Sequence, residues 1–234
     1  MRVPLILGHR GFRGRIENTI PAFRRALKYA DGIELDVRRT LDGKLVILHD
    51  GKFPCRRGEC RAEDMTYLEI VREHPLGKLV TTLPRVLKEL KPRYINIDLK
   101  DGETAEEVVK LLERKNMLET SVISTDSPET AKRLAREYPC CKIGLSIVGL
   151  RSLLGTVLTD GLYSVHVPLD VISYAGFTFF SSLIKRYHSR RLKVFVWNYG
   201  MNEIAWLPRV LPLADVLISD DPARLKRFLG TSQS

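Results

Sequence analysis

Short apolar, β-branched runs alternate with longer amphipathic patterns along most of the chain. The runs expected to form strands are Leu5–His9, Gly32–Val37, Tyr94–Leu99, Ser121–Ser124, Lys142–Ser146, Tyr163–Val167, Lys193–Trp197 and Val216–Ser219. Such alternation is typical of βαβ units around a parallel sheet. About eight strand–helix pairs within 234 residues predict a single α/β (β/α)8 TIM-type barrel.

One insertion is expected to interrupt this alternation after the second strand. Asp42 and Gly43 signal a tight turn, so Lys44–Leu48 should return as a hairpin, followed by a polar, irregular cap at 51–64. A doubly wound sheet is the alternative fold, but no G-x-G-x-x-G turn follows Leu5–His9. No linker divides the chain, so we expect one barrel domain over residues 1–230 and a C-terminal tail at 231–234.

The formal charge of +10 is compatible with nucleic acid, an anionic membrane surface or an anionic small molecule as partner. No nucleic-acid-binding motif accompanies the charge, so we expect no nucleic-acid partner. No stretch approaches the roughly 20 apolar residues of a membrane span, although contact with a membrane surface stays open. The N-terminal apolar run is too short for a signal peptide, which predicts a cytoplasmic protein. Nothing indicates the oligomeric state.

The cysteines do not indicate a metal site. Cys55 and Cys60 lie five positions apart in a polar segment, and Cys140 and Cys141 are adjacent. These spacings do not fit zinc, and no histidine pair accompanies them. Whether Cys55 and Cys60 are bridged or reduced is open at this stage.

Carboxylates gather where two expected strands end. Glu34 and Asp36 are two residues apart and therefore share one face of a strand, and Asp98 and Lys100 repeat this spacing. Three carboxylates at one barrel mouth repel one another unless a cation neutralises them. Oxygen ligands alone favour one hard divalent cation, Mg²⁺ or Ca²⁺. The alternative is that Glu34 and Asp36 pair with nearby arginines.

Two histidines accompany these carboxylates. His9 ends the first expected strand and His49 follows the hairpin, so both are candidates for general acid and base. The guanidinium of Arg10 matches phosphate oxygens, and Lys100 either contacts the phosphate or neutralises the carboxylates. The sequence does not decide which histidine is the acid.

Two further residues are expected to support the site, and a third to bind the substrate. Glu17 is expected to orient Arg10 or the metal, and Asn18 either supports the site or caps the following helix. Trp197 ends a strand and forms either core or an apolar wall for the substrate.

An ordered set of motifs covers nearly the whole chain. The motifs are His9-Arg10-Gly11, Glu17-Asn18-Thr19, Glu34-x-Asp36-Val37, His49-Asp50, Ile95 to Lys100, Trp197 and Ser219 to Pro222. Together they resemble the glycerophosphodiester phosphodiesterase family. This resemblance implies a TIM-type barrel, a divalent cation and hydrolysis of glycerophosphodiesters to glycerol phosphate and an alcohol.

The resemblance also implies roles by motif position. Glu34, Asp36 and Asp98 would ligate the metal, and His9 and His49 would form the acid/base pair. Arg10 and Lys100 would bind the phosphate.

The chain departs from the family pattern at one place that bears on the metal and at another that bears on the substrate. Asp98 stands where the family usually has glutamate, and the segment after Asp50 is short and contains Cys55 and Cys60. The preferred leaving group is therefore open. Two alternative functions stay open as well: a phosphodiesterase acting on lysophospholipids, and a non-catalytic barrel that binds an anion or a partner.

Overall fold

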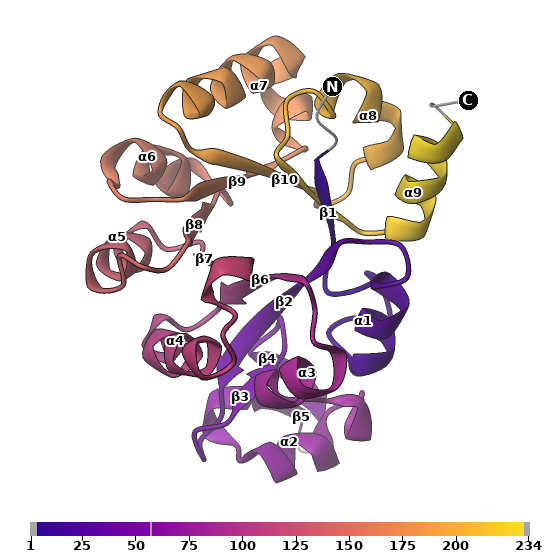
Figure 1. Cartoon of the computed structure of the whole chain (residues 1–234). Helices are drawn as coiled ribbons and strands as arrows, with labels where there is room; N and C mark the ends of the chain where they lie inside the picture. The colour runs from indigo at the N-terminus through magenta and orange to yellow at the C-terminus, as the bar shows by residue number, and fades with distance from the viewer. Residues whose placement is uncertain (1–3, 57, 232–234) are drawn as a thin grey trace.

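The computed structural model describes residues 4–56 and 58–231, which form a closed barrel of parallel strands (Figure 1). In order around the barrel the strands are β1 (Leu5–Gly8), β2 (Gly32–Arg39), β6 (Tyr94–Leu99), β7 (Ser121–Thr125), β8 (Ile143–Ser146), β9 (Ser164–Pro168), β10 (Lys193–Trp197) and β11 (Val216–Ser219). β1 pairs with both β11 and β2, which closes the sheet. The predicted (β/α)8 barrel is confirmed.

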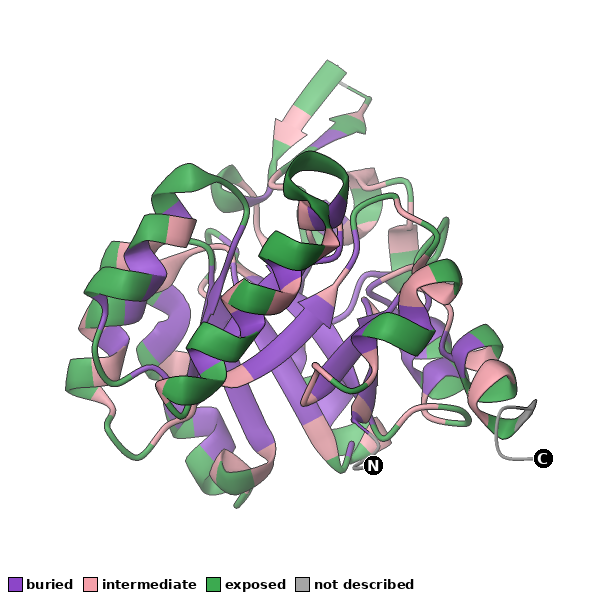
Figure 2. Cartoon of the chain, turned by 90° about the horizontal axis from the view of Figure 1, so that it is seen from above, coloured by how far each residue is buried: buried purple, intermediate pink, exposed green. Residues whose placement is uncertain are grey.

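Helices surround the strands, with their exposed faces outward and the buried strands inside (Figure 2). They are α1 (Ile20–Ala26), α3 (Leu83–Leu90), α4 (Ala105–Arg114), α5 (Pro128–Glu137), α6 (Leu150–Leu158), α7 (Val171–Ser189), α8 (Glu203–Val210) and α9 (Pro222–Thr231). Short 3-10 turns, η3 (Gly102–Thr104) and η4 (Leu118–Thr120), flank α4. Of the tail predicted at 231–234, Thr231 belongs to α9 and residues 232–234 lie outside the described residues.

Strand β2 shows how the sequence places the site. Ile33, Leu35 and Val37 are fully buried and belong to the main hydrophobic core. The alternating residues Glu34 and Asp36 lie on the opposite face of the strand and line the barrel mouth.

The insertion after β2 is more regular than expected. β3 (Leu45–Ile47) pairs antiparallel with β2, as predicted. The segment expected to be irregular instead contains a hairpin of β4 (Lys52–Cys55) and β5 (Gly58–Arg61), joined by a Cys55–Cys60 disulfide. The turns η1 (Ala62–Asp64) and η2 (Gly77–Leu79) and the helix α2 (Tyr67–Glu73) complete the insertion. The irregular assignment was wrong because these short strands bury few apolar side chains, so no alternation marks them.

The sequence offers Asn18 as a possible cap of α1, and Thr104, in the pattern Thr104-x-x-Glu107, as the cap of α4, and the structure differs at both helices. Thr19, not Asn18, caps α1 by accepting a hydrogen bond from the Ala22 backbone, because Asn18 adopts a left-handed φ of 59°. Thr104 makes no side-chain cap before α4, and its hydroxyl donates to the Asp101 carbonyl oxygen within η3. In both places a tight turn precedes the helix and shifts the capping residue.

Candidate active site

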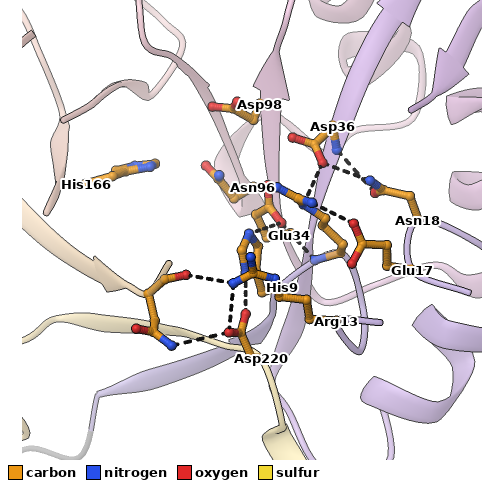
Figure 3. Close-up of polar contacts among 12 residues, drawn as sticks. His9, Arg13, Glu17, Asn18, Glu34, Asp36, Asn96, Asp98, His166 and Asp220 are labelled. Carbon is orange, nitrogen blue, oxygen red and sulfur yellow. Dashed lines mark hydrogen bonds and ion pairs between the residues drawn. The ribbon is translucent and has the colours of Figure 1, made fainter. Parts of the chain in front are cut away.

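A cavity of about 480 Å³ opens where the strands end, and it brings together most of the predicted site residues. Its walls include His9, Arg10, Glu34, Asp36, His49, Asp98, Lys100 and Trp197. Glu17 and Asn18 lie beside it and contact Arg10 and Asp36 (Figure 3). Segments separated by most of the chain length therefore meet at the barrel mouth.

The turn after β1 directs the backbone N–H group of Arg10 toward Glu34. Arg10 and Gly11 both adopt positive φ angles, of 50° and 81°. A Cβ at Gly11 would lie 2.7 Å from the Ala22 carbonyl carbon, so glycine is required there. The Arg10 backbone nitrogen consequently donates to Glu34 Oε2 at 2.9 Å.

Asp36 is the most heavily neutralised carboxylate. Its Oδ1 lies 2.9 Å from Lys100 Nζ, and its Oδ2 lies 3.1 Å from Arg10 Nε. Asn18 Nδ2 also donates to Oδ2 at 2.8 Å. Burial raises the pKa of Asp36, but Lys100 and Arg10 outweigh burial and hold this pKa well below its usual range. Asp36 is therefore a stable anion at neutral pH.

Glu34 has the opposite electrostatic environment. Burial and the neighbouring Asp36 charge raise the pKa of Glu34 to about 7. Asp98 lies directly beside Asp36 in the sheet register, and Lys100 Nζ contacts its Oδ2 at 2.7 Å. Lys100 thus bridges Asp36 and Asp98, so of its two predicted roles it neutralises carboxylates in this structure.

Each histidine is oriented by a carboxylate. His9 Nδ1 donates to Asp220 Oδ1 at 2.5 Å, which leaves Nε2 facing Glu34 Oε2 at 4.0 Å (Figure 3). Burial lowers the pKa of His9, but Asp220 and Glu34 outweigh burial and raise it overall. This favours the imidazolium form of His9.

His49 stands at the other side of the carboxylates. Its Nδ1 lies 2.7 Å from Asp50 Oδ1, and the Arg38 guanidinium holds its carbonyl oxygen. Burial lowers the pKa of His49, and Lys100 adds to this effect against the attraction of Asp36. The two histidines are therefore biased toward opposite protonation states.

The donor chemistry of the cavity suits a hard cation. Asn96 Oδ1 is buried without a hydrogen-bond partner, on the strand that carries Asp98 and in the wall of the same cavity. An unpartnered buried oxygen beside three carboxylates is the donor set that Mg²⁺ or Ca²⁺ prefers. Within residues 4–56 and 58–231, however, no three His, Cys, Asp or Glu side chains are close enough to hold a metal, and Lys100 occupies the space between Asp36 and Asp98.

Trp197 forms part of the opposite wall. Its ring lies edge-on to His9, with centroids 6.2 Å apart, and 4.2 Å from the ring of Tyr199. Asp126 and Val148 also line the cavity. Burial raises the pKa of Tyr199, and the negative charge of Asp126 contributes to this rise. Trp197 thus lines the cavity and also packs against buried core residues, and its contact with a substrate stays a prediction.

His166 is buried at the wall of the same cavity, and its ring is held by residues of the neighbouring strands. Its ring nitrogens contact the hydroxyls of Ser164 and Ser146, and its ring stacks on Phe195 at 4.5 Å. Burial lowers the pKa of His166 to about 4. His166 is therefore neutral at ordinary pH.

Sequence reasoning assigned no role to Asp220, Asn96, Arg13 or Tyr199. Asp220 directly follows β11, so extending the expected site by one residue past each strand end would have included it. Asn96 shares the inward face of β6 with Asp98, and this two-residue spacing was the available signal. No sequence pattern marked Arg13 or Tyr199 as a site residue. Only the fold brings the Arg13 guanidinium to Asp220 and to the Tyr199 carbonyl oxygen.

Comparisons with known proteins identify the family of this chain. The model of the glycerophosphoryl diester phosphodiesterase family matches residues 9–224. A glycerophosphodiester phosphodiesterase of Caldanaerobacter subterraneus is 31% identical over 94% of this chain and 96% of its own.

Solved structures share the fold. A glycerophosphodiester phosphodiesterase from Thermotoga maritima superposes with a TM-score of 0.79 at 24% identity, covering 97% of this chain and 99% of its own. One from Agrobacterium tumefaciens gives 0.77 at 23% identity, covering 96% and 99%. The chain therefore belongs to the glycerophosphoryl diester phosphodiesterase family and is an enzyme of that family.

Proposed function

We propose that this cavity hydrolyses glycerophosphodiesters to glycerol phosphate and an alcohol, by histidine acid/base catalysis with one divalent cation. The observation that carries the proposal is that His9 and His49 lie in one cavity with three carboxylates and two basic side chains, those of Arg10 and Lys100. Family membership supplies the reaction class. A cytoplasmic location stays a prediction; among the described residues no helix is long and apolar enough to cross a membrane.

Glu34, Asp36 and Asp98 are the residues that would hold the cation, and the unpartnered Asn96 Oδ1 adds a neutral oxygen. When bound, a divalent cation polarises a phosphoryl oxygen and lowers the pKa of a hydroxyl that binds to it. Lys100 contacts two of the three carboxylates, so its ammonium would be released toward the phosphate when the cation takes over their charge. The choice between Mg²⁺ and Ca²⁺ is left to experiment.

We assign His9 as general acid and His49 as general base. Asp220 fixes the His9 ring and favours its protonated form, so His9 carries a proton to the departing oxygen. His49 is favoured in its neutral form, so it accepts the proton of the attacking hydroxyl. The nucleophile is either water or the neighbouring glycerol hydroxyl, and the family resemblance favours the latter, with a cyclic phosphate that water then opens.

Arg10 is assigned to the phosphate. Glu17 Oε1 accepts a hydrogen bond from Arg10 Nη1 at 2.6 Å, and Asp36 holds Nε on the same side. These two contacts fix the plane of the guanidinium at the cavity wall. A guanidinium held in one orientation binds the oxygens of a tetrahedral phosphate with little further loss of conformational entropy.

The wall formed by Trp197, Tyr199 and Asp126 is assigned to the leaving alcohol. It lies on the His9 side, since Trp197 contacts the His9 ring edge-on. Two aromatic faces and the Asp126 carboxylate, which makes no hydrogen bond or ion pair with any of the described residues, suit a cationic alcohol such as choline or ethanolamine. The leaving-group preference that the sequence left open is therefore proposed to be cationic.

The test is turnover of glycerophosphocholine and glycerophosphoethanolamine with and without a chelator. We expect activity that a chelator abolishes, that added Mg²⁺ or Ca²⁺ restores, and that His9→Ala and His49→Ala each reduce by about 100-fold or more. Activity that persists in chelator, or in either histidine variant, would contradict the mechanism. His188→Ala, at an exposed histidine outside the cavity, is the matched control.

A second candidate function is hydrolysis of lysophospholipids. The observation in its favour is that Val148, in the cavity wall, is half-exposed and apolar, so the rim on that side is compatible with an acyl chain. Comparison of kcat/KM for lysophosphatidylcholine and glycerophosphocholine separates the two, and a higher value for the lysolipid would establish the second.

A further inference from the structure

The guanidinium of Arg13 lies where three segments of the barrel mouth meet. Its Nη1 atom donates to the Asn198 carbonyl oxygen at 3.3 Å and to the Tyr199 carbonyl oxygen. The same nitrogen lies 3.2 Å from Asp220 Oδ2 (Figure 3). Arg13 belongs to the turn after β1, whereas its partners follow β10 and β11. One cation therefore joins the turn after the first strand to the ends of the last two.

The contact of Arg13 with Asp220 bears on His9. The two oxygens of Asp220 have different partners, because Oδ1 accepts from His9 and Oδ2 lies beside Arg13. The Asn198 side-chain amide also donates to Oδ2, at 3.3 Å. Burial raises the pKa of Asp220, but His9 and Arg13 outweigh burial and hold this pKa below its usual range. Arg13 thus keeps the carboxylate ionised, with Oδ1 directed at the His9 ring.

The contact of Arg13 with Tyr199 bears on the wall of the cavity. The Tyr199 side chain is half-exposed, so burial alone does not fix its position. Instead, both backbone polar groups of Tyr199 are bound by charged side chains of other segments. Its N–H donates to Oδ2 of Asp170, directly before α7, at 2.8 Å, and its carbonyl oxygen accepts from Arg13. These two contacts place the Tyr199 ring against Trp197 at the cavity.

We propose that Arg13 is a positioning residue that couples the wall for the leaving alcohol to the general acid. Through Asp220 it orients His9, and through the Tyr199 carbonyl oxygen it holds the aromatic wall at a fixed place relative to His9. An alcohol bound at this wall then has its departing oxygen within reach of the His9 proton. The inference rests on the proposed function, in which His9 is the general acid.

Steady-state kinetics with glycerophosphocholine test the coupling. Arg13→Gln should lower kcat by about tenfold, because His9 is less well oriented. It should also raise KM by roughly threefold, because the aromatic wall is held less firmly. Asp170→Ala removes the other contact of Tyr199 and should raise KM alone, since among the described residues the Asp170 side chain contacts Tyr199 and not Asp220. A merely structural role of Arg13 would not produce this split between kcat and KM.

Two further variants complete the kinetic test. Arg13→Lys should stay within about threefold of the wild type, because a single nitrogen makes all three contacts and an ammonium group can replace it. Arg15→Gln is the matched control, at an exposed arginine of the same turn whose side chain makes no hydrogen bond or ion pair with the described residues. It should leave kcat and KM unchanged.

A double variant tests whether Arg13 acts on kcat through Asp220. Residues that act through one another have non-additive effects. When Asp220→Asn is already present, adding Arg13→Gln should therefore lower kcat no further. A further tenfold loss of kcat would overturn this route.

Hydrogen–deuterium exchange tests the contact with Tyr199 without any substrate. The Tyr199 amide should exchange faster in Arg13→Gln than in the wild type, because the loop at 198–202 opens more often. Arg15→Gln should exchange like the wild type. Unchanged exchange in Arg13→Gln would show that Arg13 does not hold the wall.

Two further kinetic results would overturn the coupling. One is equal kinetics of Arg13→Gln and Arg15→Gln, and the other is a change in only one of kcat and KM in Arg13→Gln. A wild type that does not turn over glycerophosphocholine would contradict the proposed function instead. The exchange of the Tyr199 amide would still decide whether Arg13 holds the wall.

Discussion

His9 Nδ1 lies 2.5 Å from Asp220 Oδ1, and this contact joins the end of the first barrel strand to the end of the last. The carboxylate fixes the ring so that Nε2 faces the cavity and Glu34. Asp220 is itself held by Arg13 and by Asn198. The orientation of His9, which lies near the N-terminus, therefore depends on closure of the barrel.

Asp220→Asn should lower kcat by about 100-fold or more with little change in KM, because the amide neither fixes the His9 tautomer nor stabilises its protonated form. Steady-state kinetics with glycerophosphocholine measure the effect. Asp221→Asn is the matched control, since Asp221 caps α9 by accepting from the Arg224 backbone and does not contact His9. A kcat for Asp220→Asn close to that of Asp221→Asn would contradict the role given to the His9–Asp220 pair.

His9 as general acid predicts a dependence on the leaving group. A p-nitrophenol leaving group needs little protonation, so His9→Ala should lose much less activity with a glycerophospho-p-nitrophenol ester than with glycerophosphocholine. His49→Ala should lose about the same factor with both substrates, because the general base acts on the nucleophile. The reverse pattern would exchange the two assignments.

Asp126 should determine the preference for a cationic alcohol. Asp126→Asn is expected to lower kcat/KM for glycerophosphocholine by roughly threefold, the effect of one exposed charge, and to leave glycerophosphoglycerol unchanged. Glu129→Gln is the control, because Glu129 pairs with Arg151 outside the main cavity. If Asp126→Asn lowers kcat/KM equally for both substrates, Asp126 does not select for a cationic alcohol. If the wild type turns over neither substrate, the proposed function itself is wrong.

His166 should make the fold sensitive to mild acid. Its pKa is lowered to about 4 by burial, below the value near 6.5 of an unfolded histidine. The unfolded chain therefore takes up the proton first, and stability present above pH ~6.5 is lost as the pH falls toward about 4, at about 1.4 kcal/mol per pH unit.

Urea unfolding at pH 7 and pH 5 tests this prediction. The wild type should lose about 2 kcal/mol more than His166→Gln over this interval, since the glutamine does not titrate. His188→Gln, at an exposed histidine on α7, should retain the wild-type loss. An identical loss in all three proteins would show that the acid sensitivity has another source.

The sequence predicted those site residues whose relative position follows from their spacing along a single strand. Glu34 and Asp36 had to share a face because side chains alternate along a strand, and Asp98 and Lys100 repeat the same rule. The disulfide between Cys55 and Cys60 and the hairpin around it were not predicted, because a strand with one buried side chain has no readable period. The sequence predicts that Asn18 either supports the site or caps a helix, and only the left-handed turn at this residue shows that its amide reaches Asp36.

The sequence by itself determined the barrel and the identity of the reactive groups, since periodicity sets strands and helices and the order of motifs sets the family. Tertiary structure alone decided which groups are partners. Contacts such as His9 with Asp220 and Arg13 with Tyr199 join residues about 200 positions apart, and no local rule of spacing reaches that far.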